Sequence, residues 1–161
     1  MILISHSKAK SFHFSDYEFS VGDILTPQES GYVHLPESYA MEYWLEHFRP
    51  AKCLSRSSSV FSTPDEPCGA INGRAIYGAE GSLFIVTLES VYNPANLSDL
   101  NWLSPFDQGF EDPNELLEDY TYTELEAAML SYWKGSESSA PSWEYRTHRS
   151  KVVDIRYSND T

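Results

Sequence analysis

The spacing of hydrophobic residues changes several times along the chain, which predicts a mixture of helices and short strands. Residues 82–88 are almost continuously apolar, which indicates a central strand covered on both faces. Residues 36–49 and 114–133 repeat apolar side chains every three to four positions, as helices do. Pro50 ends the first of these helices, and Gly135 caps the second.

The remaining apolar runs are short and predict strands towards both ends of the chain. Residues 2–4 predict an opening strand, 54–63 alternate as a strand does, and 8–17 fit either a loop or a second short strand. Further elements are a short helix at 68–77, a loop-like segment at 92–112, and one or two strands at 143–146 and 152–157. This order predicts one α+β domain over residues 1–161, with a mostly antiparallel sheet.

Composition narrows the class of protein. Hydrophobic residues make up 41% of the 161 residues and aromatic residues 14%, enough for the core of one domain. No apolar run approaches the roughly 18 residues of a membrane span, and the first residues lack the basic leader of a signal peptide. We therefore expect a cytoplasmic protein. Cys53 and Cys68 are too far apart for a CxxC motif, so we expect reduced thiols and no metal site.

Charge narrows the choice of partner. The formal net charge is −13, so direct nucleic-acid binding is disfavoured and a basic protein partner is favoured. The acids are concentrated: eight of them lie within residues 107–126, and residues 107–133 contain no Lys or Arg. This block suggests an alternative function, a non-enzymatic acidic protein that mimics nucleic acid and inhibits a partner.

Three short segments resemble, in order, the motifs of one enzyme family. Residues 5–9 (Ser-His-Ser-Lys-Ala) and 21–26 (Val-Gly-Asp-Ile-Leu-Thr) resemble the opening His-Gly-Thr-Lys-Ala and later Gly-Asp-Leu-Leu of the ADP-ribosyltransferase fold family. Residues 59–63 (Ser-Val-Phe-Ser-Thr) resemble its second block, and 144–147 (Glu-Tyr-Arg-Thr) its closing Ser-Tyr-Arg-Thr before a Val-rich strand. The pattern is most similar to small bacterial and phage enzymes of the rifampin ADP-ribosyltransferase type.

The resemblance implies a fold and a reaction. The fold would be α+β, with two small, mostly antiparallel sheets, a central NAD cleft and inserted helices. The reaction would be cleavage of the nicotinamide–ribose bond of NAD, with transfer of ADP-ribose to an acceptor. The acceptor could be a protein side chain, a nucleic-acid base or a small molecule, and the acidic surface favours a basic or nucleic-acid-binding protein.

The same resemblance assigns roles to individual residues. Glu144 would be the catalytic acid that faces the developing positive charge, and His6 would bind a ribose and shape the pocket. Asp112 and Glu111 are rivals of Glu144. The residues expected to contact NAD are His6, Ser7, Lys8, Arg56, Ser59, Phe61 and Ser62. Phe61 would stack on the nicotinamide, and Arg56 suits the diphosphate.

Each of these residues also has a simple structural explanation. A Glu at the start of a strand, a packed His and a core Phe are common in proteins that bind no ligand, and 56–59 read equally well as a polar edge strand. Ser7 stands where the family has Gly, and Phe61 where it has Tyr. A third alternative therefore stays open, a member of the fold that binds NAD or a nucleotide without catalysis.

Overall fold

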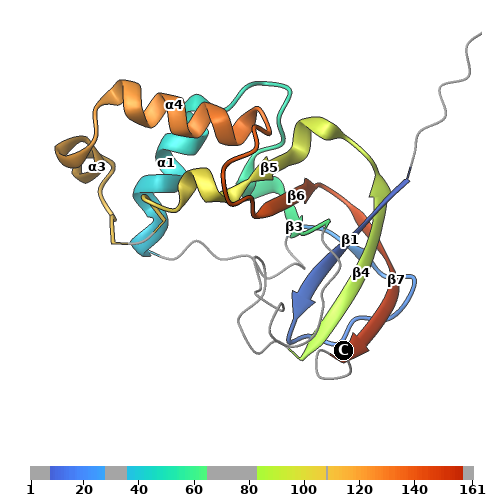
Figure 1. Ribbon diagram of the computed structural model, residues 1–161. Helices are drawn as coiled ribbons and strands as arrows, with labels where there is room; N and C mark the ends of the chain where they lie inside the picture. Colours follow the sequence, from blue (N-terminus) through green and yellow to red (C-terminus); the bar gives the residue numbers. More distant parts are fainter. Residues whose placement is uncertain (1–7, 28–35, 65–82, 108, 158–161) are drawn as a thin grey trace, which may run out of the picture.

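Two antiparallel sheets lie beside a group of helices in this α+β protein (Figure 1). The computed structural model describes residues 8–27, 36–64, 83–107 and 109–157. The four-stranded sheet has the order β1-β4-β7-β2, and the three-stranded sheet the order β3-β6-β5. The strands are β1 Lys8–Ser15, β2 Ile24–Leu25, β3 Val60–Ser62, β4 Phe84–Val91, β5 Leu97–Asp99, β6 Trp143–Thr147 and β7 Ser150–Tyr157. The predicted α+β class and antiparallel pairing are confirmed, whereas an NAD cleft stays a prediction.

The apolar run that predicts a central strand corresponds to β4, Phe84–Val91, which lies in the interior of the larger sheet, as predicted. Strand β4 pairs with β1 on one side and β7 on the other, and all its residues from Phe84 to Leu88 are buried. The partner β1 is a full eight-residue strand, which resolves the choice between loop and strand at 8–17. The pairing of β4 with β7 shifts between Thr87 and Leu88, so the sheet is irregular there.

His13 joins the two sheets. Phe12 of β1 and Thr63 exchange backbone hydrogen bonds of 2.8 and 2.9 Å. Beside them, His13 Nδ1 donates to the carbonyl oxygen of Phe61 on β3 at 2.7 Å, because a carbonyl can only accept. Burial lowers the pKa of His13, and the hydrogen bond to Phe61 opposes this only in part. The imidazole is therefore neutral, with its proton on Nδ1.

The helices pack on each other around aromatic side chains. They are α1 Tyr39–Phe48, α3 Pro113–Asp119 and α4 Tyr122–Trp133. Trp44 and Trp133 are buried between them, and their indole nitrogens donate to the carbonyl oxygens of Pro113 and Leu45 at 2.9 and 2.8 Å. Because each indole N–H has an acceptor, these large rings can lie in the core without leaving a buried donor unpaired.

The single helix predicted over 114–133 is wrong, because the structure has two helices there. Tyr120 and Thr121 adopt extended backbone angles between α3 and α4. The Thr121 hydroxyl accepts a hydrogen bond from the backbone N–H of Glu124 at 3.1 Å and so begins α4. A Thr that caps a new helix competes with continuation of the old one. Gly135 does follow the end of α4 with φ +70°, as predicted.

The strand predicted over 54–63 is shorter than expected. Residues Arg56–Ser58 form a 3-10 turn, and only Val60–Ser62 pair as β3. The Ser59 hydroxyl donates to the carbonyl oxygen of Ser55 at 2.6 Å. Such side-chain hydrogen bonds stabilise a turn where the backbone would otherwise pair in a sheet. Arg56 therefore leaves the sheet and points towards the helices.

Two other predictions at chain segments have mixed outcomes. The segment 92–112 holds the short strand β5 and two 3-10 turns, so the prediction of a loop-like segment was incomplete. The helix at 36–49 is confirmed, after a 3-10 turn at Pro36–Ser38, although Tyr39 and Tyr43 of its predicted apolar stripe are exposed. The predicted strand at 2–4 and helix at 68–77 lie outside the described residues. None of the described helices is long and apolar enough to cross a membrane.

We predict that His13 makes stability depend on pH below neutrality. The unfolded imidazole titrates near its usual pKa of about 6.5, whereas the folded one has a lowered pKa. The unfolded state therefore binds more protons, and stability falls as pH drops below about 6.5, by at most about 1.4 kcal/mol per pH unit. Urea unfolding between pH 5 and 8 measures this slope. His13→Gln should flatten it, and an unchanged slope in that variant would contradict the prediction.

Candidate functional site

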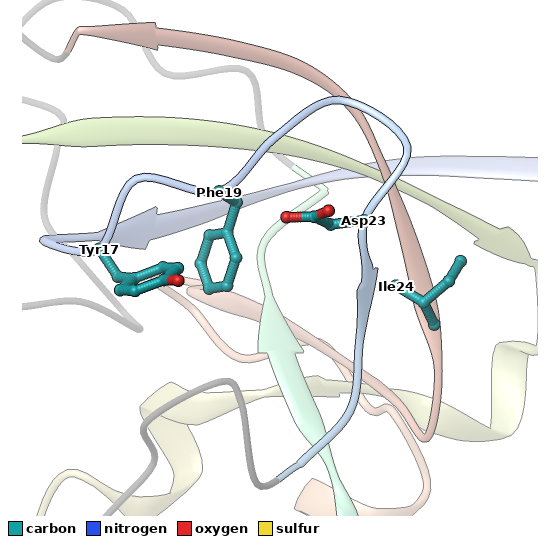
Figure 2. A pocket seen from close by; sticks show the side chains of 4 residues that line it. All are labelled: Tyr17, Phe19, Asp23 and Ile24. Atoms are coloured by element: carbon teal, nitrogen blue, oxygen red, sulfur yellow. The ribbon is translucent and has the colours of Figure 1, made fainter.

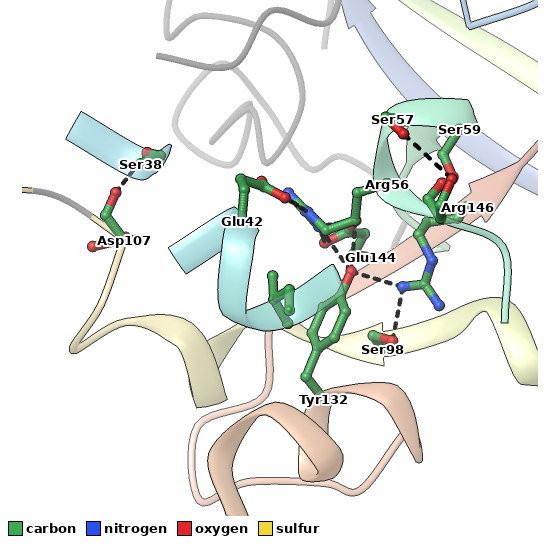
Figure 3. Close-up of polar contacts among 12 residues, drawn as sticks. Ser38, Glu42, Arg56, Ser57, Ser59, Ser98, Asp107, Tyr132, Glu144 and Arg146 are labelled. Atoms are coloured by element: carbon green, nitrogen blue, oxygen red, sulfur yellow. Dashed lines mark hydrogen bonds and ion pairs between the residues drawn. The ribbon is translucent and has the colours of Figure 1, made fainter. Parts of the chain in front are cut away.

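A buried ion pair between Arg56 and Glu144 lies where the helices meet the smaller sheet (Figure 3). Arg56 Nη1 donates to both carboxylate oxygens of Glu144, at 2.6 and 2.9 Å. Glu144 on β6 is 0% exposed and Arg56 is 6% exposed. An enclosed pair of opposite charges compensates the loss of water only when its geometry is good and its other donors are bonded.

Further contacts complete the hydrogen bonding of this pair. Arg56 Nε donates to Glu42 of α1 at 2.9 and 3.0 Å. The Tyr132 hydroxyl accepts from Arg56 Nη1 at 2.8 Å and from Arg146 Nη1 at 2.7 Å, and donates to Glu144 at 3.1 Å. Burial raises the pKa of Tyr132 to about 12, although the two guanidinium charges oppose this, so the hydroxyl keeps its proton at neutral pH.

Arg146 adds a second enclosed cation to the cluster. It is 0% exposed, and its Nη1 also donates to the Ser98 hydroxyl of β5 at 2.8 Å. Its guanidinium carbon lies 4.8 Å from the ring centre of Trp133 and 5.1 Å from that of Tyr132. Arg56 and Arg146 thus balance Glu42 and Glu144, and this buried charge cluster has no formal net charge.

Arg56 also covers the aromatic residue that was expected to stack on nicotinamide. Its guanidinium carbon lies 4.8 Å from the ring centre of Phe61, which is 1% exposed. A ligand could therefore contact neither Phe61 nor the Glu144 carboxylate while Arg56 holds this position. The structure brings Arg56, Phe61 and Glu144 together but encloses them, so their assigned roles towards NAD stay predictions.

Asp99 fixes the segment that leads into β6 and Glu144. Its buried carboxylate accepts backbone hydrogen bonds from Asn101, Ser138 and Ser142 at 2.9, 2.7 and 2.9 Å. Burial alone would raise the pKa of Asp99, but these bonds lower it overall, so the group is a carboxylate. The N–H groups of Ser138 and Ser142 tie β5 to the loop before β6, and the N–H of Asn101 begins the turn after β5.

Two pockets flank the cluster and β3. One has a volume of about 200 Å³ and is lined by Glu42, Leu45, Glu46, Arg56, Ser57 and Trp133. The other has a volume of about 510 Å³, and its described lining is Tyr17, Phe19, Asp23 and Ile24 (Figure 2). Phe19 packs with Val60, whereas the next residue along β3 lies under Arg56. Successive strand residues face opposite sides, so Val60 and Phe61 face different sides of β3, and Phe61 is the one that contacts the charge cluster.

The other residues predicted to contact NAD lie in different surroundings. Ser59 and Ser62 are buried, and their hydroxyls donate to the backbone oxygens of Ser55 and Tyr145 at 2.6 and 3.4 Å. Lys8 is exposed at the start of β1 and pairs with Glu89 at 3.3 Å. His6 and Ser7 lie outside the described residues, so their assigned roles stay predictions.

The rival acids Asp112 and Glu111 are exposed, away from the charge cluster. Asp112 begins α3: its carboxylate accepts the Asn114 N–H at 2.9 Å, and the Glu115 carboxylate accepts the Asp112 N–H at 3.2 Å. This reciprocal capping box explains the acids at that point through helix stability. Asp112 therefore caps a helix, whereas Glu144 forms a buried ion pair.

Sequence reasoning missed three members of the cluster. Glu42 lies within a predicted helix, where an acid reads as a solvent-facing residue. Tyr132 lies in the helix predicted over 114–133, and Arg146 lies in the closing motif at 144–147, where no role was assigned to it. One signal in the sequence could have pointed to them. Arg56 and Arg146 both lie close to aromatic residues of predicted strands, and an Arg that becomes buried there needs acidic or hydroxyl partners from other elements.

In the described part of the chain, no three His, Cys, Asp or Glu side chains are grouped to hold a metal ion. No protein-family model matches this sequence, and no curated protein matches it significantly.

We predict strong energetic coupling between Arg56 and Glu144. Arg56→Gln leaves the Glu144 carboxylate enclosed without its main partner and should cost about 3–5 kcal/mol of unfolding free energy. The double change with Glu144→Gln removes both charges and should cost less than the two single changes together. Urea unfolding of the four proteins measures the coupling, with the exposed Arg149→Gln as control. Additive losses would mean that the pair is not a unit.

Proposed function

We propose that this protein is an NAD-dependent ADP-ribosyltransferase that breaks the nicotinamide–ribose bond. The observation that carries the proposal is the convergence of Arg56, Phe61 and Glu144. Phe61 and Glu144 come from two separate segments of the resemblance, and Arg56 lies just before the first of these. Arg56 contacts both of the others, at 2.6 Å for Glu144 and 4.8 Å for the Phe61 ring centre. A cation, an aromatic ring and a carboxylate are the groups that recognition of NAD and cleavage of this bond require.

Glu144 supplies the negative charge in this proposal. Loss of nicotinamide leaves positive charge on the ribose, and a fixed carboxylate beside it lowers the barrier. The hydrogen bond that Glu144 accepts from Tyr132 holds the carboxylate in place. A carboxylate enclosed among aromatic rings also acts without screening by water, which strengthens its effect.

Arg56 controls access to that carboxylate. The diphosphate of NAD carries two negative charges and accepts paired N–H donors, so it can compete with Glu144 for the guanidinium. Movement of Arg56 onto the diphosphate would uncover Glu144 and Phe61 together. The hydrogen bond from Arg56 Nε to Glu42 holds the other edge of the guanidinium, so a short rotation about that edge is enough to release Glu144.

The size of the pocket next to Arg56 limits how NAD can bind. Its volume of about 200 Å³ is below the roughly 300–1,000 Å³ usual for small-molecule sites. This pocket can take the diphosphate or the nicotinamide, and the remainder of NAD must extend beyond it. Ser57 and Arg56 supply donors at its wall, while Glu42 and Glu46 disfavour an anion there unless Arg56 turns towards it.

We predict that the purified protein releases nicotinamide from NAD and that Glu144→Gln abolishes this release. The expected loss is about a hundredfold or more, as for other groups that stabilise charge in a transition state. Nicotinamide can be quantified by chromatography. Glu118→Gln, an exposed acid on α3, is the matched control and should keep full activity.

The outcomes separate the possible functions. Assays should run below the unfolding temperature of each variant, measured by circular dichroism, so that lost activity is not lost folding. Full activity in Glu144→Gln together with loss in Asp112→Asn would transfer the catalytic role to Asp112. NAD binding by calorimetry without any release would indicate a member that binds but does not catalyse, and no binding at millimolar NAD would refute the proposal.

A further inference from the structure

An exposed aromatic face lies on the helices, separate from the charge cluster. It consists of Tyr39, Tyr43 and His47 on α1 and Tyr122 at the start of α4, and we call these four residues the aromatic face. The three tyrosines are 48%, 53% and 48% exposed. Residues 39, 43 and 47 are each four apart, so they follow one side of α1, opposite the buried Ala40, Met41, Trp44 and Leu45.

Three rings of the aromatic face, those of Tyr43, His47 and Tyr122, are held in place by contacts among themselves and with the core. Tyr43 and His47 are stacked, with ring centres 6.4 Å apart and planes at 11°. His47 Nε2 and the Tyr122 hydroxyl are hydrogen-bonded at 3.1 Å. Tyr122 also packs on the edges of Trp44 and Phe48, with ring centres 5.9 and 5.3 Å away. These three rings are therefore preorganised, so binding a partner would cost little of their side-chain entropy.

The charges near the aromatic face are predominantly negative. Tyr122 lies between Asp119 and Glu124 in the sequence, and both acids are exposed. On α1, Glu46 is exposed one residue before His47. The adjacent cation, Arg49, already donates to Glu46 and to the carbonyl oxygen of Cys53. Exposed aromatic rings bordered by carboxylates match guanidinium groups, which stack on rings and bond to carboxylates at once.

We propose that the aromatic face docks an arginine-rich segment of a partner protein. Tyrosine rings would receive the guanidinium planes, and Asp119 and Glu124 would accept their N–H groups. Nucleic acid does not fit this surface, because the protein carries a net charge of −13 and phosphates would be repelled. Lysine-rich segments fit less well, since an ammonium group cannot stack on a ring as a plane. The proposal does not depend on NAD cleavage.

The test uses fluorescein-labelled nona-arginine as the probe and fluorescence anisotropy as the readout, without NAD. The unchanged protein should bind the probe, and the double variant Tyr39→Ala, Tyr43→Ala should bind about tenfold more weakly at moderate salt. Tyr157→Ala removes a tyrosine of comparable exposure, 56%, from the end of β7 and is the matched control. Circular dichroism should show that α1 is intact, since both replaced side chains face solvent.

Two results would overturn the proposal. Equal affinity in the double variant and the control would show that the aromatic rings take no part. Equal binding of nona-lysine and nona-arginine would show general attraction to an acidic protein, without recognition of guanidinium groups. A variant with Asp119→Asn and Glu124→Gln should weaken binding and reduce its salt dependence, and an unchanged salt dependence would argue against the flanking acids. These results do not depend on whether the protein cleaves NAD, so the docking proposal and the proposed function can fail separately.

Discussion

The buried contact between Arg56 and Glu144 is the interaction on which the junction of helices and sheets depends. The partners of Arg56 come from α1, α4 and β6, and Arg146 extends the cluster to β5. Two guanidinium groups and the Glu144 carboxylate are enclosed, and the half-buried Glu42 completes the balance, so each charge requires the others to remain where they are. Removing one member would leave a charge without compensation at the point where the helical core meets the smaller sheet.

The same contact connects stability with the proposed chemistry. Arg56 occupies the positions that NAD would need on Glu144 and Phe61, so the cluster in this state is closed to a ligand. An anion able to replace Glu144 as partner of Arg56 would open it, and a diphosphate has the charge and acceptor geometry to do so. Binding would then exchange one ion pair of Arg56 for another. The Glu144 carboxylate would keep its hydrogen bond from Tyr132 and would face the positive charge that develops on the ribose.

Sequence patterns predicted this fold where a segment's own residues decide its structure. The apolar run of β4, the helix α1 and the closing strands could be recognised because burial and periodicity mark them directly. The break before Thr121 and the turn at Arg56 could not, since a side-chain hydrogen bond in each case outweighs a continuous pattern. Arg56, Phe61 and Glu144 were grouped through a resemblance of short motifs. Their enclosure depends on Glu42, Tyr132 and Arg146, whose roles appear only when distant elements are brought together.

The most direct test of the central idea is to follow the Arg56 side chain when a diphosphate ligand binds. Its Nε–H group can be observed by nitrogen-15 nuclear magnetic resonance, assigned with Arg56→Lys, and titrated with ADP-ribose, which carries the diphosphate but no nicotinamide. We expect the Arg56 signal to shift with saturation, together with the ring signals of Phe61, because the guanidinium leaves Glu144 for the ligand. An Arg56 signal that stays unchanged while ADP-ribose binds elsewhere would contradict the exchange of partners at this site.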